Sequence, residues 1–271
     1  MINDMNRQRL VLLIAQLLVV PLDAAATDTV AETAEKRPRI GLVLGGGGAR
    51  GAAHIGVLKE LERQRIPVDV IAGTSMGAIV GGLYASGMTA AELEELVGSL
   101  DWAAALSDEP SREDLSFRRK QDDSDFPVDL ELGLRGGNLV LPQGVIQGQK
   151  LDLLLRKLTL PVSQVRDFDQ LPIPFRAIAS DVELGVSYVM QSGDLAAAIR
   201  ASMSVPGVFA PVTRGGRLLA DGGLTGNLGV NVIEAMDVDV IIAVDVEFPL
   251  YDEAALDSSL AVYEQMLTIL I

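Results

Sequence analysis

Two apolar segments, each followed by a glycine-containing turn and a helical pattern, constrain the fold of this chain more than any other feature. Residues 39–44 and 68–72 have the composition of buried strands. Between them, residues 52–63 place apolar side chains at helical spacing, and residues 76–85 form a second helical stretch rich in small residues. Strand, helix, strand and helix in short succession predict parallel β-α-β units and therefore an α/β fold.

The rest of the chain continues this alternation. A capping box at residues 89–92 predicts the start of a third helix. Further elements are expected as helices at 149–158 and 196–203 and as strands at 175–180, 218–220 and 240–244. Residues 127–148 contain several glycines and a proline, which predict turns and short strands.

Composition narrows the class of protein. The chain has 271 residues, of which 49% are hydrophobic, and this is enough for one sizeable core, so residues 39–271 are interpreted as a single domain. The net charge of -15 disfavours nucleic acid as a partner and strong electrostatic docking on anionic lipid. The absence of cysteine excludes disulfides, thiolate chemistry and zinc-cysteine sites.

The first 38 residues are interpreted as a signal peptide, 1–26, and a polar linker, 27–38. Arg7 and Arg9 precede an apolar run at 10–22, and three alanines follow at 24–26. An uncleaved anchor is the alternative. The pattern predicts export, to the periplasm, to the outer-membrane surface or out of the cell. At the other end, the apolar residues 266–271 lack a stop signal, so the chain is interpreted as a truncated one.

The glycine loop after the first strand has three interpretations. Gly46, Gly48 and Gly51 match a dinucleotide fingerprint, but its acidic candidate, Asp69, falls near the start of the second strand rather than its end. A phosphate loop would require a Lys-Ser/Thr that is missing. The third interpretation is that backbone N–H groups of the loop stabilise an oxyanion, next to the N-terminus of a helix.

Ser75 is the candidate nucleophile, because Gly73-Thr74-Ser75-Met76-Gly77 follows a predicted strand and precedes a predicted helix. A serine hydroxyl needs a base. Hydrolases built on this turn usually place a histidine after the serine, but His54, the single histidine, precedes it. Asp221, in an Asp-Gly-Gly turn, and Asp181 are the carboxylate candidates for the base, and each also has a purely structural interpretation.

Two further features bear on membrane contact. Residues 107–126 carry runs of both charge signs, which indicate a solvated loop or, alternatively, a cover over an active site. Trp102, the single tryptophan, precedes this loop and could touch lipid or pack in the core. Aromatic residues make up 4% of the chain, and no aromatic belt marks a membrane-facing surface.

Three motifs in one order, the glycine loop, the serine turn and Asp-Gly-Gly, resemble the patatin-like phospholipase family, over residues 38 to 248. The resemblance implies a three-layer α/β/α sandwich with a mostly parallel central sheet, lipid acyl hydrolase activity, and neither metal nor cofactor. It implies that Ser75 is the nucleophile and Asp221 the base. The remaining site residues that it implies are those of the oxyanion loop, Gly46, Gly47, Gly48, Arg50 and Gly51, of the nucleophile turn, Gly73, Met76 and Gly77, and of the base motif, Gly222 and Gly223.

One departure from the family concerns the turn after Asp221. The family usually shows Asn-Asn-x-Pro there, whereas this chain has Gly226-Asn227-Leu228-Gly229, so a looser turn is expected. The resemblance extends to bacterial secreted patatins that continue into a periplasmic module and an outer-membrane barrel, which a longer parent chain could contain.

The expected substrate is a phospholipid or another fatty-acyl ester, reached by transient contact with a membrane surface. Three different functions stay open at the level of sequence. They are a lysophospholipase or soluble-ester esterase with the same two catalytic residues, a non-catalytic protein that binds lipid or a partner, and a nucleotide-binding protein that uses the glycine loop.

Overall fold

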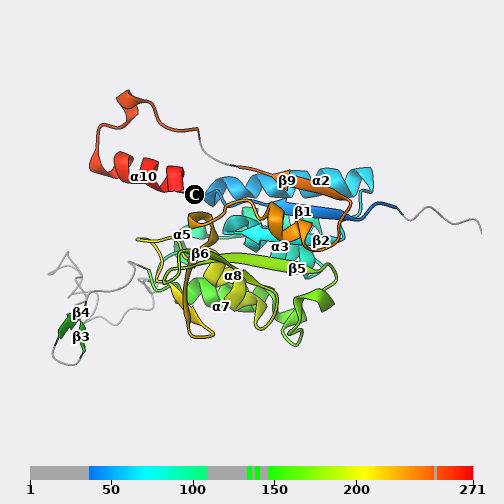
Figure 1. The fold of residues 1–271 in the computed structure, drawn as a ribbon, viewed down its shortest axis with the longest axis horizontal. Coiled ribbons are helices and arrows are strands. Elements are labelled where there is room, and N and C mark those ends of the chain that lie inside the picture. The colour runs from blue at the N-terminus through cyan, green and yellow to red at the C-terminus, as the bar shows by residue number, and fades with distance from the viewer. Residues whose placement is uncertain (1–36, 109–132, 136–137, 141–145, 247–248, 271) are drawn as a thin grey trace, which may run out of the picture. The chain divides into compact units, whose positions relative to one another are not determined.

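The computed structural model describes residues 37–108, 133–135, 138–140, 146–246 and 249–270 (Figure 1). The expected signal peptide, most of the linker and most of the charged stretch 107–126 lie outside the described residues. The chain divides into two units, and the account that follows concerns the second, from Pro38 onward.

A seven-stranded sheet with the order β7-β8-β5-β2-β1-β9 forms the centre of this unit, and β6 pairs with β5. Its strands are β1 (Ile40–Leu44), β2 (Val70–Thr74), β5 (Phe175–Asp181), β6 (Val186–Met190), β7 (Val212–Arg214), β8 (Arg217–Asp221) and β9 (Val240–Val244). A separate two-stranded sheet consists of β3 (Gly133–Arg135) and β4 (Asn138–Val140).

The helices follow the predicted order along the chain. The α-helices are α2 (Ala53–Gln64), α3 (Met76–Ala85), α4 (Ala90–Ser99), α5 (Trp102–Ala105), α7 (Gln149–Leu158), α8 (Leu195–Ser202), α9 (Val230–Glu234) and α10 (Ser259–Leu270). The 3-10 helices are η1 (Gly48–Ala52), η2 (Leu160–Val162), η3 (Phe168–Gln170), η4 (Gly222–Leu224) and η5 (Glu253–Ala255). The capping box predicted at Thr89 and Glu92 is confirmed at the start of α4.

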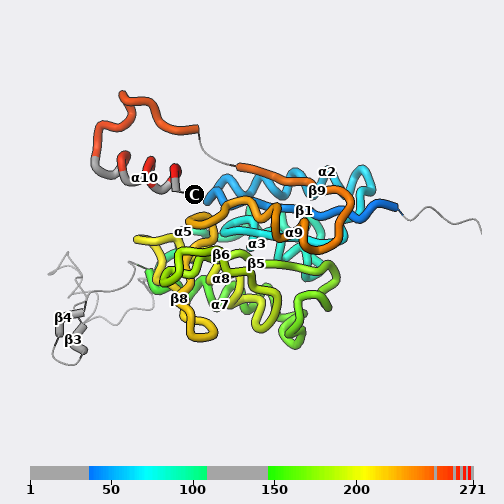
Figure 2. Tube along the Cα trace, viewed as in Figure 1, coloured from blue at the N-terminus to red at the C-terminus, as the bar shows by residue number. Residues whose placement is uncertain are grey.

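Four strands form the parallel core of the sheet. β9, β1, β2 and β5 run parallel, and Figure 2 shows β1 and β9 side by side, with Ile40 paired to Val240 from the other end of the chain. β6 and β8 each pair with β5 in antiparallel fashion, and β7 pairs with β8, also antiparallel. The expected mostly parallel sheet is therefore confirmed in its centre, and the sheet becomes antiparallel beyond β5.

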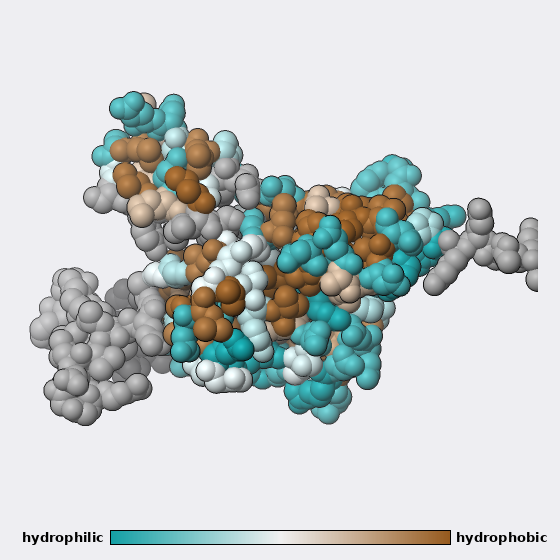
Figure 3. Space-filling view, viewed as in Figure 1, coloured by the Kyte–Doolittle hydropathy of each residue, from teal (hydrophilic) through white to brown (hydrophobic). Residues whose placement is uncertain are grey.

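Successive side chains of each strand point to opposite faces of the sheet, and apolar side chains are buried on both faces. In β1, Leu42 and Leu44 point toward the layer of α2, α3, α4, α7 and α8, whereas Val43 points toward α9. Ile233 of α9 is fully buried on that second face. Helices therefore lie on both faces of the sheet, which confirms the three-layer sandwich, although α9 is short. Figure 3 shows apolar side chains still exposed over β9 on the α9 side.

No helix in the described part of the chain is long and apolar enough to span a bilayer.

Candidate active site

The site forms where β2 and β8 end next to each other along β5. Thr74, the last residue of β2, pairs with Ile178, and Asp221, the last residue of β8, pairs with the next residue, Ala179. Because β6 occupies the other edge of β5, β2 and β8 must lie on the same edge and meet end to end. The sheet thus brings Ser75 and Asp221 together from distant parts of the sequence, as the serine-carboxylate interpretation requires.

Ser75 occupies a strained turn between β2 and α3. Its φ of 53° and ψ of -120° are unusual for a residue with a side chain. The two glycines of the motif, Gly73 and Gly77, have no room for a side chain of their own. A Cβ at Gly73 would overlap the carbonyl oxygen of Gly77, and a Cβ at Gly77 would overlap that of Leu44. Both glycines of the motif are therefore required by the close approach of α3 to β1 and β2.

Ser202, at the end of α8, supports the backbone of this turn. The backbone N–H of Ser75 donates to the Ser202 hydroxyl oxygen at 2.9 Å, and that hydroxyl donates to the carbonyl oxygen of Ile178 at 2.5 Å. Ser202 is completely buried. A single side chain thus ties the strained turn to the point on β5 where the two strands meet.

Asp221 is also completely buried and is held by the same segment after α8. Its backbone N–H donates to the carbonyl oxygen of Ser204 at 2.9 Å, and its carboxylate Oδ1 accepts the backbone N–H of Gly223 at 2.9 Å. The Ser204 hydroxyl in turn accepts a hydrogen bond from the buried guanidinium of Arg200 at 2.8 Å. The segment 202–204 therefore positions the candidate nucleophile and the candidate base together.

Burial raises the pKa of Asp221 from 3.8 to about 6, while hydrogen bonding from Ser75 and from the Gly223 backbone lowers it. Oδ2 of Asp221 has no hydrogen-bond partner among the described residues. A carboxylate with this raised pKa and one oxygen free of hydrogen bonds from described residues is a stronger proton acceptor than an ordinary aspartate.

The glycine loop lies directly beside the serine turn. A Cβ at Gly46 would lie 3.1 Å from the Cβ of Ser75, and a Cβ at Gly51 would overlap the side chain of Met76. The backbone N–H of Gly46 already donates to Oδ1 of Asn227 at 2.7 Å, and the Asn227 amide donates back to the Gly46 carbonyl at 3.2 Å. The Asn227 side chain thus fixes the loop from the turn after Asp221, where the sequence predicts a looser connection.

Among the predicted oxyanion residues, Gly47 and Gly48 differ from Gly46 in the state of their backbone N–H groups. Within the described residues, neither N–H has a hydrogen-bond partner in the structure, and Gly48 is exposed with a φ of 55°. The Gly47 carbonyl accepts the N–H of Arg50 at 3.2 Å, which closes the loop into η1. The loop therefore has two available donors, while Gly46 is occupied.

His54 does not contact Ser75. It is completely buried in the first turn of α2, and its Nε2 lies 2.8 Å from the carbonyl oxygen of Gly45, to which it donates. Burial lowers the pKa of this imidazole, although the hydrogen bond to Gly45 and the charge of Asp245 oppose the change. His54 therefore supports the end of β1, just before the glycine loop. This contact fits a structural role for His54 and does not fit the role of a base for Ser75.

Asp181 and Asp69, the acidic residues considered for a base and for a ribose contact, take part in structural interactions. Asp181 forms an ion pair with Arg217 at 2.5 Å. Asp69 accepts the backbone N–H of Ile40 at 2.8 Å, at the beginning of β1 and therefore at the opposite end of the sheet from the glycine loop. It is consequently out of place for holding a ribose in a dinucleotide site. Among the described residues, no three His, Asp or Glu side chains are grouped to hold a metal ion.

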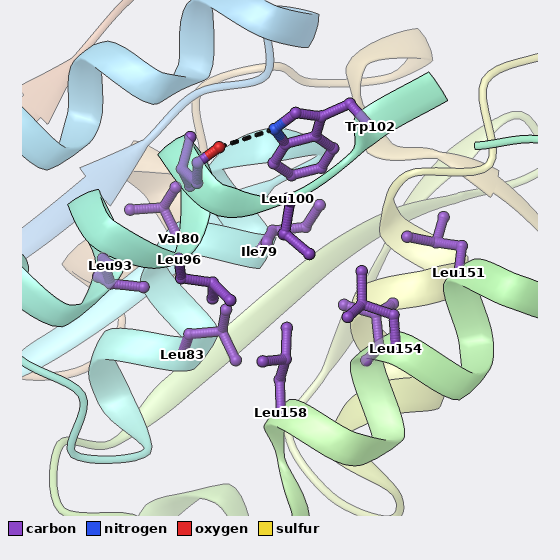
Figure 4. Close-up of a pocket in the computed structure, with 12 residues that line it drawn as sticks. Ile79, Val80, Leu83, Leu93, Leu96, Leu100, Trp102, Leu151, Leu154 and Leu158 are labelled. Carbon is purple, nitrogen blue, oxygen red and sulfur yellow. Dashed lines mark hydrogen bonds between the residues drawn. The ribbon is translucent and has the colours of Figure 1, made fainter. Parts of the chain in front are cut away.

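An apolar pocket lies between α4, α5, α7 and α3, the helix that follows Ser75 (Figure 4). It is lined entirely by aliphatic side chains and Trp102, and it begins at Ile79, one helical turn after Ser75. The indole N–H of Trp102 donates to the carbonyl oxygen of Val97 at 3.0 Å. Trp102 is half-buried in this pocket, which supports core packing over lipid contact.

Three supporting residues, Ser202, Ser204 and Asn227, are not identified by any sequence motif. Asn227 belongs to a predicted turn, but no local pattern ties it to the glycine loop. Ser202 lies in the last turn of the helix expected at 196–203 and Ser204 directly follows that helix, where a serine ordinarily indicates only a helix end. The contacts of Ser202 with Ser75 and of Asn227 with Gly46 join residues more than a hundred positions apart in the sequence.

The comparisons with known proteins agree with the motifs. A family model described as patatin-like phospholipase matches residues 42–233, which include the glycine loop, Ser75 and Asp221. The chain belongs to the patatin-like phospholipase family. A protein of Mycobacterium bovis, described as an uncharacterized NTE family protein, is 38% identical over 207 residues, and patatin-like phospholipase domain-containing protein 6 of Mus musculus is 31% identical over 209 residues.

Each of these relatives is longer than the matched region. The match covers 76% of this chain in both cases, but 49% of the mycobacterial protein and 13% of the mouse protein. Among solved structures, VipD from Legionella pneumophila is similar with a TM-score of 0.46 and 16% identity, covering 81% of this chain and 52% of VipD. The chain thus spans about half or less of the length of the mycobacterial and mouse relatives.

Proposed function

We propose that this chain is a serine lipid acyl hydrolase of phospholipase A type, which cleaves fatty-acyl esters of phospholipids through Ser75 and Asp221. Membership of the patatin-like phospholipase family implies lipid acyl hydrolase activity. The observation that carries the proposal further is the meeting of β2 and β8 along β5, which places a strained serine beside a buried carboxylate with a pKa of about 6.

In the first half of the reaction, the Ser75 oxygen attacks the ester carbonyl carbon while its proton passes to Oδ2 of Asp221. The carbonyl oxygen becomes an oxyanion that accepts hydrogen bonds from the N–H groups of Gly47 and Gly48. One such donor typically contributes about 10²–10³ in rate. The intermediate then collapses, Asp221 returns its proton to the leaving alcohol oxygen, and the acyl group stays on Ser75 as an ester.

In the second half, a water molecule attacks the acyl-enzyme. Asp221 accepts a proton from this water, and the same N–H groups stabilise the second oxyanion. Collapse of the intermediate returns the proton to the Ser75 oxygen and releases the fatty acid. The raised pKa of Asp221 suits this alternation, since an acid–base group works best when its pKa approaches the working pH.

Two rival functions use the same site differently. A lysophospholipase or esterase would act on soluble esters with the same two residues, and the rate on a single substrate would then not rise when that substrate aggregates. A non-catalytic protein that binds lipid or a partner is disfavoured by the available Gly47 and Gly48 donors and by the unpaired Oδ2 of Asp221.

Fluorophosphonate labelling with intact-mass readout tests the proposal. We expect one adduct on the wild-type chain and none on Ser75→Ala, because the probe reacts with an activated serine. Asp221→Asn should label far more slowly while keeping its fold, as judged by circular dichroism. A folded wild-type chain without an adduct, or a Ser75→Ala chain with one, would contradict the proposed nucleophile.

We also propose that the protein is exported by its first 26 residues and acts in the periplasm, at the outer-membrane surface or outside the cell. The support is the charge, apolar run and small-residue pattern of that segment. A periplasmic module and an outer-membrane barrel in a longer parent chain belong to the same proposal, and fractionation of cells that express the parent gene tests it.

A further inference from the structure

Three aliphatic side chains are exposed within five residues at the β5–β6 hairpin. Val182, Leu184 and Val186 are 51%, 60% and 49% exposed. Single exposed aliphatic residues are common on soluble proteins, but hairpin turns ordinarily carry polar residues and glycine. Figure 3 shows apolar side chains gathered at the surface in the region of β6. We call these three residues the hairpin patch.

The turn that carries the hairpin patch is well ordered. The Asp181 carboxylate accepts hydrogen bonds from the backbone N–H groups of Glu183 and Leu184, each at 3.1 Å. The backbone N–H of Gly185 donates to the Asp181 carbonyl oxygen at 2.8 Å, and Gly185 has a φ of 66°. Arg217 fixes the other oxygen of Asp181 at 2.5 Å. The aliphatic side chains are therefore held outward by a hydrogen-bonded turn and do not fold back onto the sheet.

The hairpin patch projects from the catalytic end of the sheet. Ala179 pairs with Asp221, so Val182 lies three residues, or roughly 10 Å, further along the strand. The hairpin is also attached to the turn after the base. Ser180 Oγ donates to the Gly222 carbonyl at 3.3 Å, and the Ser180 and Ser187 hydroxyls lie 2.7 and 3.0 Å from that of Thr225.

The chemistry of the hairpin favours a lipid surface over an electrostatic partner. Between Val182 and Val186 the chain carries one charge, Glu183, and the whole chain has a net charge of -15. Attraction to anionic headgroups is therefore weak, and binding must come from transferring aliphatic side chains out of water. The substrate class proposed for Ser75 occurs in such a surface.

We propose that the hairpin patch inserts into the outer part of a phospholipid surface and so brings the β2–β8 junction next to its substrate. Val182 and Leu184 lie in the turn and Val186 begins β6, so the three exposed side chains are gathered at the end of the hairpin. The idea rests on the proposed function for its choice of lipid, but insertion is measurable without catalysis.

The absence of cysteine from the chain permits a site-specific test of insertion. Leu184→Cys, combined with Ser75→Ala, is labelled with an environment-sensitive fluorophore and mixed with phosphatidylcholine vesicles. We expect a blue shift and a several-fold rise in emission. Val240→Cys, a 44% exposed position where β9 begins, at the opposite end of the sheet, is the control and should not respond. Because the label reports its own site, binding through the first 26 residues does not mimic the result.

Activity gives the second test. In the triple variant Val182→Ser, Leu184→Ser and Val186→Ser, we expect the ratio of vesicle hydrolysis to soluble-ester hydrolysis to fall about tenfold. Val240→Ser should leave this ratio unchanged, and anionic lipid should not strengthen wild-type binding. A silent label at Leu184→Cys, or an unchanged ratio, overturns the proposal and points to a protein partner for the hairpin patch. If the wild-type chain hydrolyses neither substrate, the proposed function fails, and the label still decides the hairpin.

Discussion

Ser75 holds a backbone conformation that its own five-residue motif does not stabilise. With φ at 53°, the residue requires surrounding structure to keep it in place. That support comes from Ser202, whose hydroxyl accepts the Ser75 N–H and donates to the Ile178 carbonyl. At the scale of single residues, the geometry of the proposed nucleophile thus depends on a buried hydroxyl that contacts the Ser75 backbone.

The Ser202 hydroxyl gives a direct prediction. Ser202→Ala leaves the Ser75 N–H and the Ile178 carbonyl buried without their partner, so we expect kcat to fall about 10- to 100-fold with little change in KM. The rate of fluorophosphonate labelling should fall in parallel. Steady-state kinetics on a soluble ester measure the first effect.

Ser204→Ala is the matched control for Ser202→Ala. It removes a buried hydroxyl two residues away but keeps the carbonyl that holds the Asp221 backbone. We expect this variant to lose stability with a smaller loss of kcat. Equal losses of kcat in both variants would show that the segment after α8 acts through stability alone.

At the scale of elements, the site depends on how closely α3 approaches the ends of β1 and β2. Gly77 lies against the Leu44 and Gly45 carbonyls, and Gly73 lies against the first turn of α3. This approach places the serine turn beside the glycine loop. Asn227 adds a second connection, because it joins that loop to the turn after Asp221.

Gly77→Ala should separate α3 from the end of β1. A Cβ there would overlap backbone atoms, which cannot move independently, so we expect a loss of roughly 1–3 kcal/mol in the free energy of unfolding and a severe loss of activity. Gly56→Ala in α2 is the matched control. Its Cβ would meet nothing within 4 Å, so the helix should gain about 0.5–1 kcal/mol. Urea denaturation of both variants decides the matter, and a neutral Gly77→Ala would contradict the packing argument.

At the scale of the whole molecule, Asp221, the proposed base, affects how the stability of the fold depends on pH. Burial disfavours its charged form, so the folded chain binds a proton more tightly than the unfolded chain, in which the pKa is near 3.8. The contribution of Asp221 to stability is therefore greatest below pH 4 and is lost as the pH rises through about 6. At pH 8 this loss amounts to roughly 3 kcal/mol.

Activity and stability should consequently depend on pH in opposite directions. We expect kcat/KM to rise between pH 5 and pH 7, as Asp221 loses its proton and becomes a base. Asp221→Asn should be inactive, yet more stable than the wild type at pH 8, and the difference should vanish toward pH 4. Thermal denaturation of both chains across this range measures the effect, and an Asp221→Asn chain less stable than the wild type at pH 8 would contradict a destabilising buried carboxylate.

Local sequence patterns are enough to predict the order and type of most elements. The structure contains the strands predicted at 39–44 and 240–244, the helix predicted at 52–63 and the capping box predicted at Thr89. These features are predictable because short-range sterics and periodicity specify them. The glycines around Ser75 are equally predictable, since a tight turn needs them. The motifs alone thus indicate the family and the two residues proposed to act.

Which distant groups meet depends on the tertiary structure. The reversal of the sheet beyond β5, the end-to-end meeting of β2 and β8, and the contacts of Ser202, Ser204 and Asn227 arise from packing between separate segments of the chain. The burial of Asp221, which sets its pKa, has the same origin. A local pattern determines the conformation of neighbouring residues. Contact between remote segments depends on how all the layers pack together, and no single stretch of sequence specifies that packing.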